Sequence, residues 1–136
     1  MTIEQFFGTM VQSPVEVWKK HLETPKYSAH MALDTCYQEL PELVDTTLED
    51  YMGIIGGKVE KYVNVLSSDK MSAYDYLMSL RDFVLNAREE LFSEMPSIQS
   101  DIDDILKLVN QTMYRLHELT ESRSCLAFIK DALIND

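Results

Sequence analysis

The sequence predicts an all-α protein: an antiparallel four-helix bundle with a longer connection between the second and third helices and a short C-terminal helix. Apolar residues recur at spacings of three and four residues, the pattern of amphipathic helices. Only four glycines and four prolines occur, so long uninterrupted elements are expected. The length of 136 residues and the 46% hydrophobic content fit one soluble domain that spans residues 1–136.

Ser13 marks the predicted start of the first helix. Glu16 follows three residues later, which is the spacing of a capping box, and Pro14 would occupy the first helical position. This pattern predicts a short helix that ends at about residue 21. Residues 2–11 are expected to add another turn or two of helix before it.

Thr24 repeats the start signal in front of Pro25, where the missing N–H of proline costs nothing. The second helix is predicted to run from there to about Met52 and to stop at Gly53. Pro41 lies inside this helix, where it removes one backbone hydrogen bond and can kink the axis.

The second half of the chain has the remaining start signals. Residues 53–68 are predicted to form a crossover connection that contains a short helix. Ser72 would cap the third helix, and Pro96 separates it from a fourth helix with a clear apolar face. Residues 125–134, "CLAFIKDALI", are predicted to form the short C-terminal helix.

The net charge of −11 limits the classes of partner. Nucleic-acid binders neutralise phosphates with clustered lysine and arginine, which this chain lacks, so direct nucleic-acid binding is disfavoured. No apolar run approaches the roughly 20 residues of a membrane span, and no secretory signal is evident. Cys36 and Cys125 are expected to be buried thiols of a cytoplasmic protein. Cations, metal ions and basic proteins are the natural counterparts of such a surface.

Two histidines and three carboxylates form the candidate site. On one helix, with His30 taken as zero, Asp34 lies at roughly 40°, Asp45 at roughly 60° and Glu49 at roughly 100°. These four side chains therefore share one quadrant of the second helix. His21 precedes them near the end of the first helix.

The axial rise divides this set into two half-sites. His30 and Asp34 are one turn apart, as are Asp45 and Glu49, but His30 and Asp45 are separated by about 22 Å. One chain therefore cannot assemble all of them around one ion. A second, antiparallel copy across a two-fold axis could join the half-sites and would create two equivalent composite sites. Imidazole and carboxylate ligands suit iron(II), manganese or zinc better than calcium.

The order His21, His30, Asp34, Asp45, Glu49 resembles the ferroxidase signature of the Dps proteins, the ferritin-like miniferritins of bacteria. "GIIGG" at 53–57 resembles the glycine pair that follows the glutamate in that family. The sequence from "HLETPKYSAHMAL" through "LVDTTLEDYMG" is more similar still to ferritin-like proteins of tailed phages.

This resemblance implies a ferritin-like bundle and an iron site between subunits. His21, His30 and Asp34 of one subunit would bind the metal together with Asp45 and Glu49 of its two-fold mate. The implied activity is the oxidation of Fe(II) by peroxide or oxygen, in which His30, Asp34, Asp45 and Glu49 would be catalytic. A homo-oligomer is expected, a dimer through the second helix or a larger shell that sequesters iron.

Two other interpretations stay open. Pairs of acidic and histidine side chains four residues apart are common on solvated helix faces, in which case the chain binds no ion. A small acidic helical protein of phage type could instead engage a host or virion protein without catalysis, and here the charge itself would be the function. The phage resemblance places either version in the cytoplasm of an infected bacterial cell.

Overall fold

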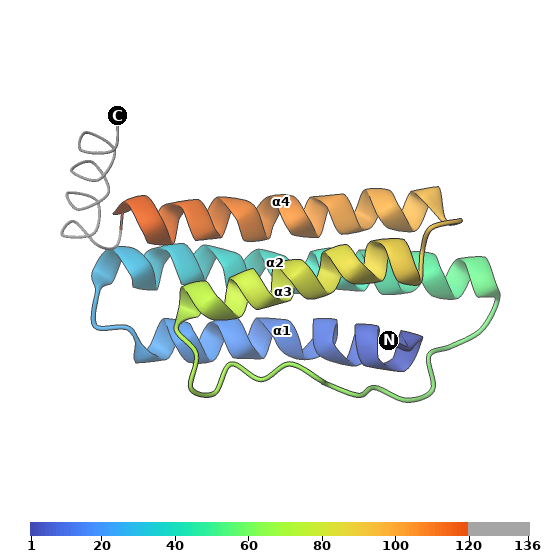
Figure 1. Ribbon diagram of the computed structural model, residues 1–136, viewed down its shortest axis with the longest axis horizontal. Helices are drawn as coiled ribbons and strands as arrows, with labels where there is room; N and C mark the ends of the chain where they lie inside the picture. The colour runs from blue at the N-terminus through green and yellow to red at the C-terminus, as the bar shows by residue number, and fades with distance from the viewer. Residues whose placement is uncertain (120–136) are drawn as a thin grey trace.

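The computed structural model describes residues 1–119 and shows an all-α chain that forms a helical bundle (Figure 1). Within these residues no strand occurs. The predicted C-terminal helix, 125–134, lies outside the described residues. The four helices are α1 (Ile3–Glu23), α2 (Tyr27–Ile55), α3 (Ala73–Glu90) and α4 (Pro96–Leu119).

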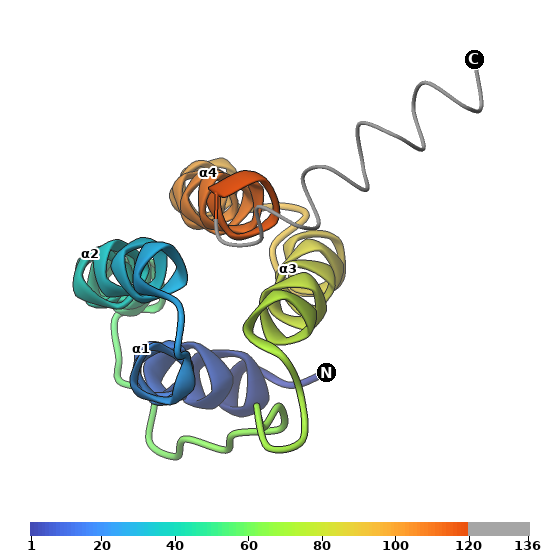
Figure 2. The ribbon, with the colours of Figure 1, turned by 90° about the vertical axis from the view of Figure 1, so that its left-hand side faces the viewer.

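The helices stand at the corners of a four-sided arrangement when seen end on (Figure 2). Helix α2 packs against α1 and α4, and α3 packs against the same two helices from the opposite corner. Figure 1 shows that α1 and α4 run in one direction along the bundle and that α2 and α3 run in the other. The long connection after α2 returns the chain to the end of the bundle from which α2 started.

The core lies along the axis of the bundle and is most aromatic at one end. Phe6 and Phe7 of α1 are fully buried there, and their rings contact Phe92 at centroid distances of 5.2 and 6.2 Å. Tyr51 of α2 closes this cluster at 5.3 Å from Phe7. Such aromatic contacts add to the hydrophobic stabilisation that holds the four helices together.

Cys36 is buried on α2, as predicted. Burial raises the pKa of its thiol to about 11, although a hydrogen bond with Thr112 of α4 acts in the opposite direction. A thiol in this environment is inert at neutral pH. Cys125 lies outside the described residues.

The prediction that Ser13 starts the first helix is wrong, because α1 is one continuous helix from Ile3. Its capping box is formed by Thr2 and Gln5, each side chain bonding the other's backbone N–H. Pro14 lies inside the helix and has no N–H to donate to the carbonyl of Met10. The hydroxyl of Ser13 donates to that carbonyl instead, at 2.7 Å, so the acceptor stays satisfied.

Helix α2 differs from its prediction at both ends. It begins at Tyr27, and Thr24 terminates α1 rather than capping α2. Gly53 lies within the helix, which ends where Gly56 adopts a left-handed conformation with φ of 68°. The helix is continuous through Pro41, so the proline does not divide the two halves of the candidate site.

The connection between α2 and α3 is extended, and the predicted short helix within 53–68 is wrong. The backbone N–H of Val63 donates to the carbonyl of Glu4 at 3.0 Å, and that of Val65 donates to the hydroxyl of Thr9 at 3.0 Å. The backbone N–H of Ser68 donates to the carboxylate of Glu16 at 2.7 Å. The segment is held along α1 by these bonds, which replace the internal hydrogen bonds of a helix (Figure 1).

The starts of α3 and α4 agree with the sequence signals. Ser72 is the N-cap of α3, and its hydroxyl accepts a hydrogen bond from the backbone N–H of Asp75 at 3.0 Å. Pro96 is the first residue of α4. Within residues 1–119, no helix is both long enough and apolar enough to cross a membrane.

Candidate metal centre

A three-residue turn brings His21 and His30 together. His21 lies in the last turn of α1 and is 6% exposed, and His30 lies in the first turns of α2 and is half-buried. The turn is short because the backbone N–H of Thr24 bonds back to the carbonyl of Lys20, and that of Lys26 bonds to the hydroxyl of Thr24. The two imidazole rings stack with a centroid distance of 3.6 Å and an interplanar angle of 28°.

Each histidine is tied to the backbone of the other. The Nδ1 atom of His21 lies 2.8 Å from the carbonyl oxygen of His30, and the Nδ1 atom of His30 lies 3.1 Å from the carbonyl oxygen of His21. A carbonyl oxygen can only accept, so both Nδ1 atoms carry hydrogen. In the neutral ring this leaves the lone pair on Nε2, which is the tautomer of a histidine that binds a metal through Nε2.

Asp34 completes the first half-site. Its carboxylate oxygen lies 3.9 Å from Nε2 of His21, and its side chain is 28% exposed. Tyr37 lies one helical turn after Asp34 on α2, and the centroid of its ring is 5.1 Å from that of the His21 ring. The structure therefore brings His21, His30 and Asp34, the residues that the resemblance assigns to one subunit, close to one another.

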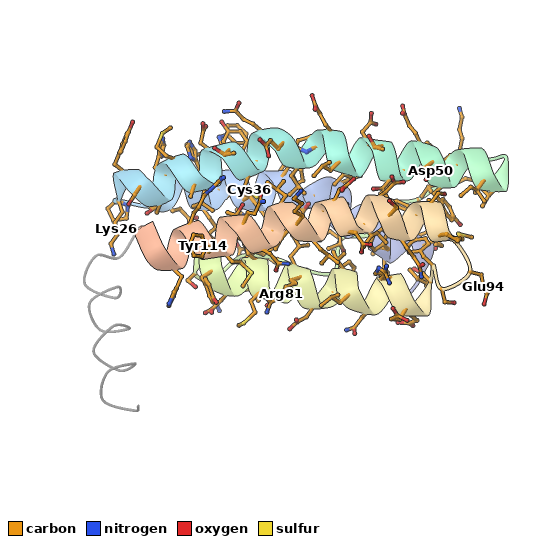
Figure 3. The ribbon with its side chains drawn as sticks, turned by 90° about the horizontal axis from the view of Figure 1, so that it is seen from above. Lys26, Cys36, Asp50, Arg81, Glu94 and Tyr114 are labelled. Atoms are coloured by element: carbon orange, nitrogen blue, oxygen red, sulfur yellow. The ribbon has the colours of Figure 1, made fainter. Side chains whose placement is uncertain are left out.

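Asp45 and Glu49 form the second half-site, one turn apart on an exposed part of α2. Since α2 is continuous, the rise of a helix keeps Asp45 about 22 Å and Glu49 about 28 Å from His30. Figure 3 shows the length of this helix between the labelled Lys26 and Asp50, which flank the two half-sites.

No cluster of three or more histidine, cysteine, aspartate or glutamate side chains within residues 1–119 is close enough to hold a metal ion. The donor atoms fit iron, manganese or zinc by type, but one chain does not assemble them. The set of His21, His30 and Asp34 is included in this absence, so their binding of a metal stays a prediction.

Sequence reasoning missed the environment of Trp18. Its ring stacks on that of Tyr37 at 6.1 Å, beside His21, although Trp18 is 47% exposed. The signal was a second apolar stripe on the same helix, which turns away from the core. Its members are Val11, Val15, Trp18 and Leu22, at intervals of four, three and four residues.

Glu16 is a second residue that the sequence did not single out, because its local pattern indicated a helix cap. It is 2% exposed and accepts hydrogen bonds from Gln12 and from the backbone of Ser68. Burial acts to raise the pKa of this carboxyl, but these hydrogen bonds and the charge of Lys19 outweigh burial and hold its pKa below the ordinary value. The carboxylate therefore fixes the connection to α1 and is not available as a ligand.

Comparison of the sequence with known proteins assigns the chain to a family. A family model described as a family of unknown function, DUF5856, matches residues 21–116. The chain belongs to this family. The DUF5856 match begins at His21 and includes all five candidate ligands.

A curated relative supports the phage part of the resemblance. An uncharacterized 14.6 kDa protein of the mobD-ri intergenic region of Enterobacteria phage T4 is 31% identical over 114 residues. The aligned region covers 83% of this chain and 86% of the phage protein. No solved structure matches.

Proposed function

We propose that this chain is a phage-type metal-binding protein whose site is completed by a second copy. His21, His30 and Asp34 of one copy would bind an ion together with Asp45 and Glu49 of the other. The two-fold axis that joins one pair of half-sites also joins the other pair, so a dimer would hold two equivalent sites.

The hydrogen bonds of the two histidines support this proposal most directly. A half-buried histidine on a solvated face has no need of a defined tautomer. Here the backbone carbonyls of His21 and His30 fix both rings, and each leaves Nε2 as the basic atom. Nε2 of His21 also faces the carboxylate of Asp34.

The arrangement of the helices supports a ferritin-like bundle. Each pair of packed helices runs antiparallel, and α2 and α3, which are parallel, occupy opposite corners (Figures 1 and 2). The long connection that follows α2 makes this order achievable, because it carries the chain back along the bundle.

The donor set suits iron, with manganese or zinc as alternatives. With Fe(II) as substrate, each ion would give up one electron. Hydrogen peroxide would accept two electrons and two protons as its O–O bond breaks to form two water molecules. The carboxylates would offset the charge of the ferric product, and the acidic surface would retain it.

Metal stoichiometry in the wild type and in an Asp45→Asn/Glu49→Gln variant tests the proposal. Equilibrium dialysis against Zn(II) or anaerobic Fe(II), with the native mass measured in parallel, should give about one bound ion per chain in a wild-type dimer. The variant should lose this binding. It removes ligands that lie about 22 Å or more from His30 of its own chain, so a loss places them in one site with the histidines of the other copy.

A matched control removes the same charge elsewhere. Asp82→Asn/Glu89→Gln alters two exposed carboxylates of α3, outside both half-sites, and should bind metal as the wild type does. Metal uptake by a monomer, or uptake that ignores the loss of Asp45 and Glu49, would contradict the proposal.

A second candidate function follows from the charge of −11 and the kinship with a phage protein. In this version the chain engages a basic surface of a host or virion protein and performs no chemistry. Binding to such a partner should weaken steeply with added salt and should be indifferent to chelators and to Glu49→Gln. In either version we place the protein in the cytoplasm of the infected bacterial cell.

A further inference from the structure

The outer side of α1 carries an apolar stripe that the fold leaves uncovered. Val11, Val15, Trp18 and Leu22 are between 42% and 64% exposed. The sole carboxylate within residues 11–22 belongs to Glu16, which is buried and bonded to the connection. In a chain of net charge −11, this stripe therefore offers a second acidic copy a surface that contributes no exposed carboxylate of its own.

A hollow lies beside this stripe, in the groove between α1 and α2. Its volume is about 210 Å³. Five of its six lining residues are apolar, and the sixth is Asp45. The apolar residues are Val11, Pro14, Pro41, Val44 and Leu48. Both helix-interior prolines line the hollow, and Asp45 links it to the second half-site.

The shared metal site fixes how two copies would meet. His30 and Glu49 are equally far along α2 from a centre between Glu39 and Leu40, and so are Asp34 and Asp45. A single two-fold axis at that centre therefore joins both pairs. The positions of the candidate ligands alone determine this axis.

The same axis relates Trp18 to the hollow. Trp18 stacks on Tyr37, so it lies at the level of Tyr37 along the bundle. Tyr37 and Glu42 are equally far from the centre between Glu39 and Leu40, so the two-fold axis brings Tyr37 of one copy to the level of Glu42 of the other. Glu42 lies between Pro41 and Val44, within the part of α2 that lines the hollow. Along α2, Trp18 of one copy therefore lies at the level of the hollow of the other.

We infer that two copies of this chain form a dimer in which Trp18 of each copy fills the hollow between α1 and α2 of the other. This inference rests on the axis of the proposed shared site. The contact is isologous, so it occurs twice, and a large aromatic side chain in a pocket is the usual anchor of a stable interface. Because the anchor is apolar, the dimer should persist without metal.

Sedimentation equilibrium in the presence of a chelator tests the inference. Trp18→Ala should weaken dimerisation by about 30-fold or more, the effect of losing an interface anchor. Tyr114→Ala removes an exposed aromatic side chain of α4, seen in Figure 3, and should leave the dimer unchanged. Leu48→Arg, which puts a charge into the hollow, should weaken the dimer as Trp18→Ala does.

The intrinsic fluorescence provides a readout on the unmodified protein, because Trp18 is the sole tryptophan. Its emission should shift to longer wavelength on dilution through the dissociation range. A monomer at all concentrations, a Trp18→Ala variant that dimerises normally, or an emission spectrum that ignores dissociation would each overturn the inference. A dimer that depends on Trp18 but takes up no metal would overturn the metal proposal and leave the interface standing.

Discussion

His21 and His30 show how far residue-level reasoning from the sequence reached. Their spacing from Asp34, Asp45 and Glu49 predicted two half-sites. The structure places His21, His30 and Asp34 near one another but not in a cluster that could hold a metal ion. The sequence could not predict the hydrogen bonds of the two rings, because these depend on the turn between α1 and α2. That turn makes each backbone carbonyl the partner of the other ring.

Asp101 of α4 carries the clearest pH dependence among single residues. Burial raises its pKa to about 6, and a hydrogen bond and like charge from Asp50 of α2 act in the same direction. The folded chain therefore holds this proton to higher pH than the unfolded chain does. The stability contributed by the protonated carboxyl is present below about pH 4 and is lost as pH rises to about 6.

Asp101→Asn should therefore stabilise the protein at pH 7, where the wild type has two carboxylates in contact. We expect a gain on the order of 1 kcal/mol, because solvent screens a group that is only partly buried. Denaturant unfolding at pH 7 and at pH 4 measures this, and the gain should vanish at pH 4. Glu94→Gln, an exposed site in the turn before α4, is the control (Figure 3). A gain that is equal at both pH values would contradict the assignment.

Helix positions were easier to predict than helix ends. Ser72 and Pro96 gave the starts of α3 and α4, because the capping signal and the apolar stripe agree there. Ser13 was misleading, because a serine before a proline can also satisfy a carbonyl inside a helix. The prediction of a short helix in the connection was wrong for a different reason. The hydrogen bonds of this segment go to α1, more than 50 residues away in sequence, and no local sequence pattern indicates them.

Gly8 of α1 tests the packing of this connection. A Cβ at this position would overlap the backbone of Val63, which has no room to withdraw because its N–H is bonded to Glu4. Gly8→Ala should therefore destabilise the protein by about 1–3 kcal/mol, although alanine favours helix by up to about 1 kcal/mol over glycine.

Gly53→Ala provides the matched control on α2. A Cβ there meets nothing within 4 Å, so only the helix propensity remains. Thermal or urea unfolding should show a small gain in stability for this variant and a loss for Gly8→Ala. If the two variants respond alike, the connection does not pack on α1 as described.

The whole molecule is an acidic bundle, and the outer side of α1 carries a stripe of four exposed apolar side chains. The charge and the helical periodicity were evident from the sequence. The relation between the apolar stripe, the hollow and the two half-sites was not, because it requires the packing of α1 on α2. These features converge on one expectation, that the functional unit is a pair of chains.

Mixing two inactive variants tests the shared site most directly. His30→Gln damages one half-site and Asp45→Asn/Glu49→Gln damages the other, so neither variant alone should bind metal. After the chains are exchanged in equal amounts, half of the dimers are mixed, and each mixed dimer contains one intact site. We predict that Zn(II) binding recovers to about one quarter of the wild-type capacity. No recovery in chains shown to have exchanged, or full binding by either variant alone, would contradict it.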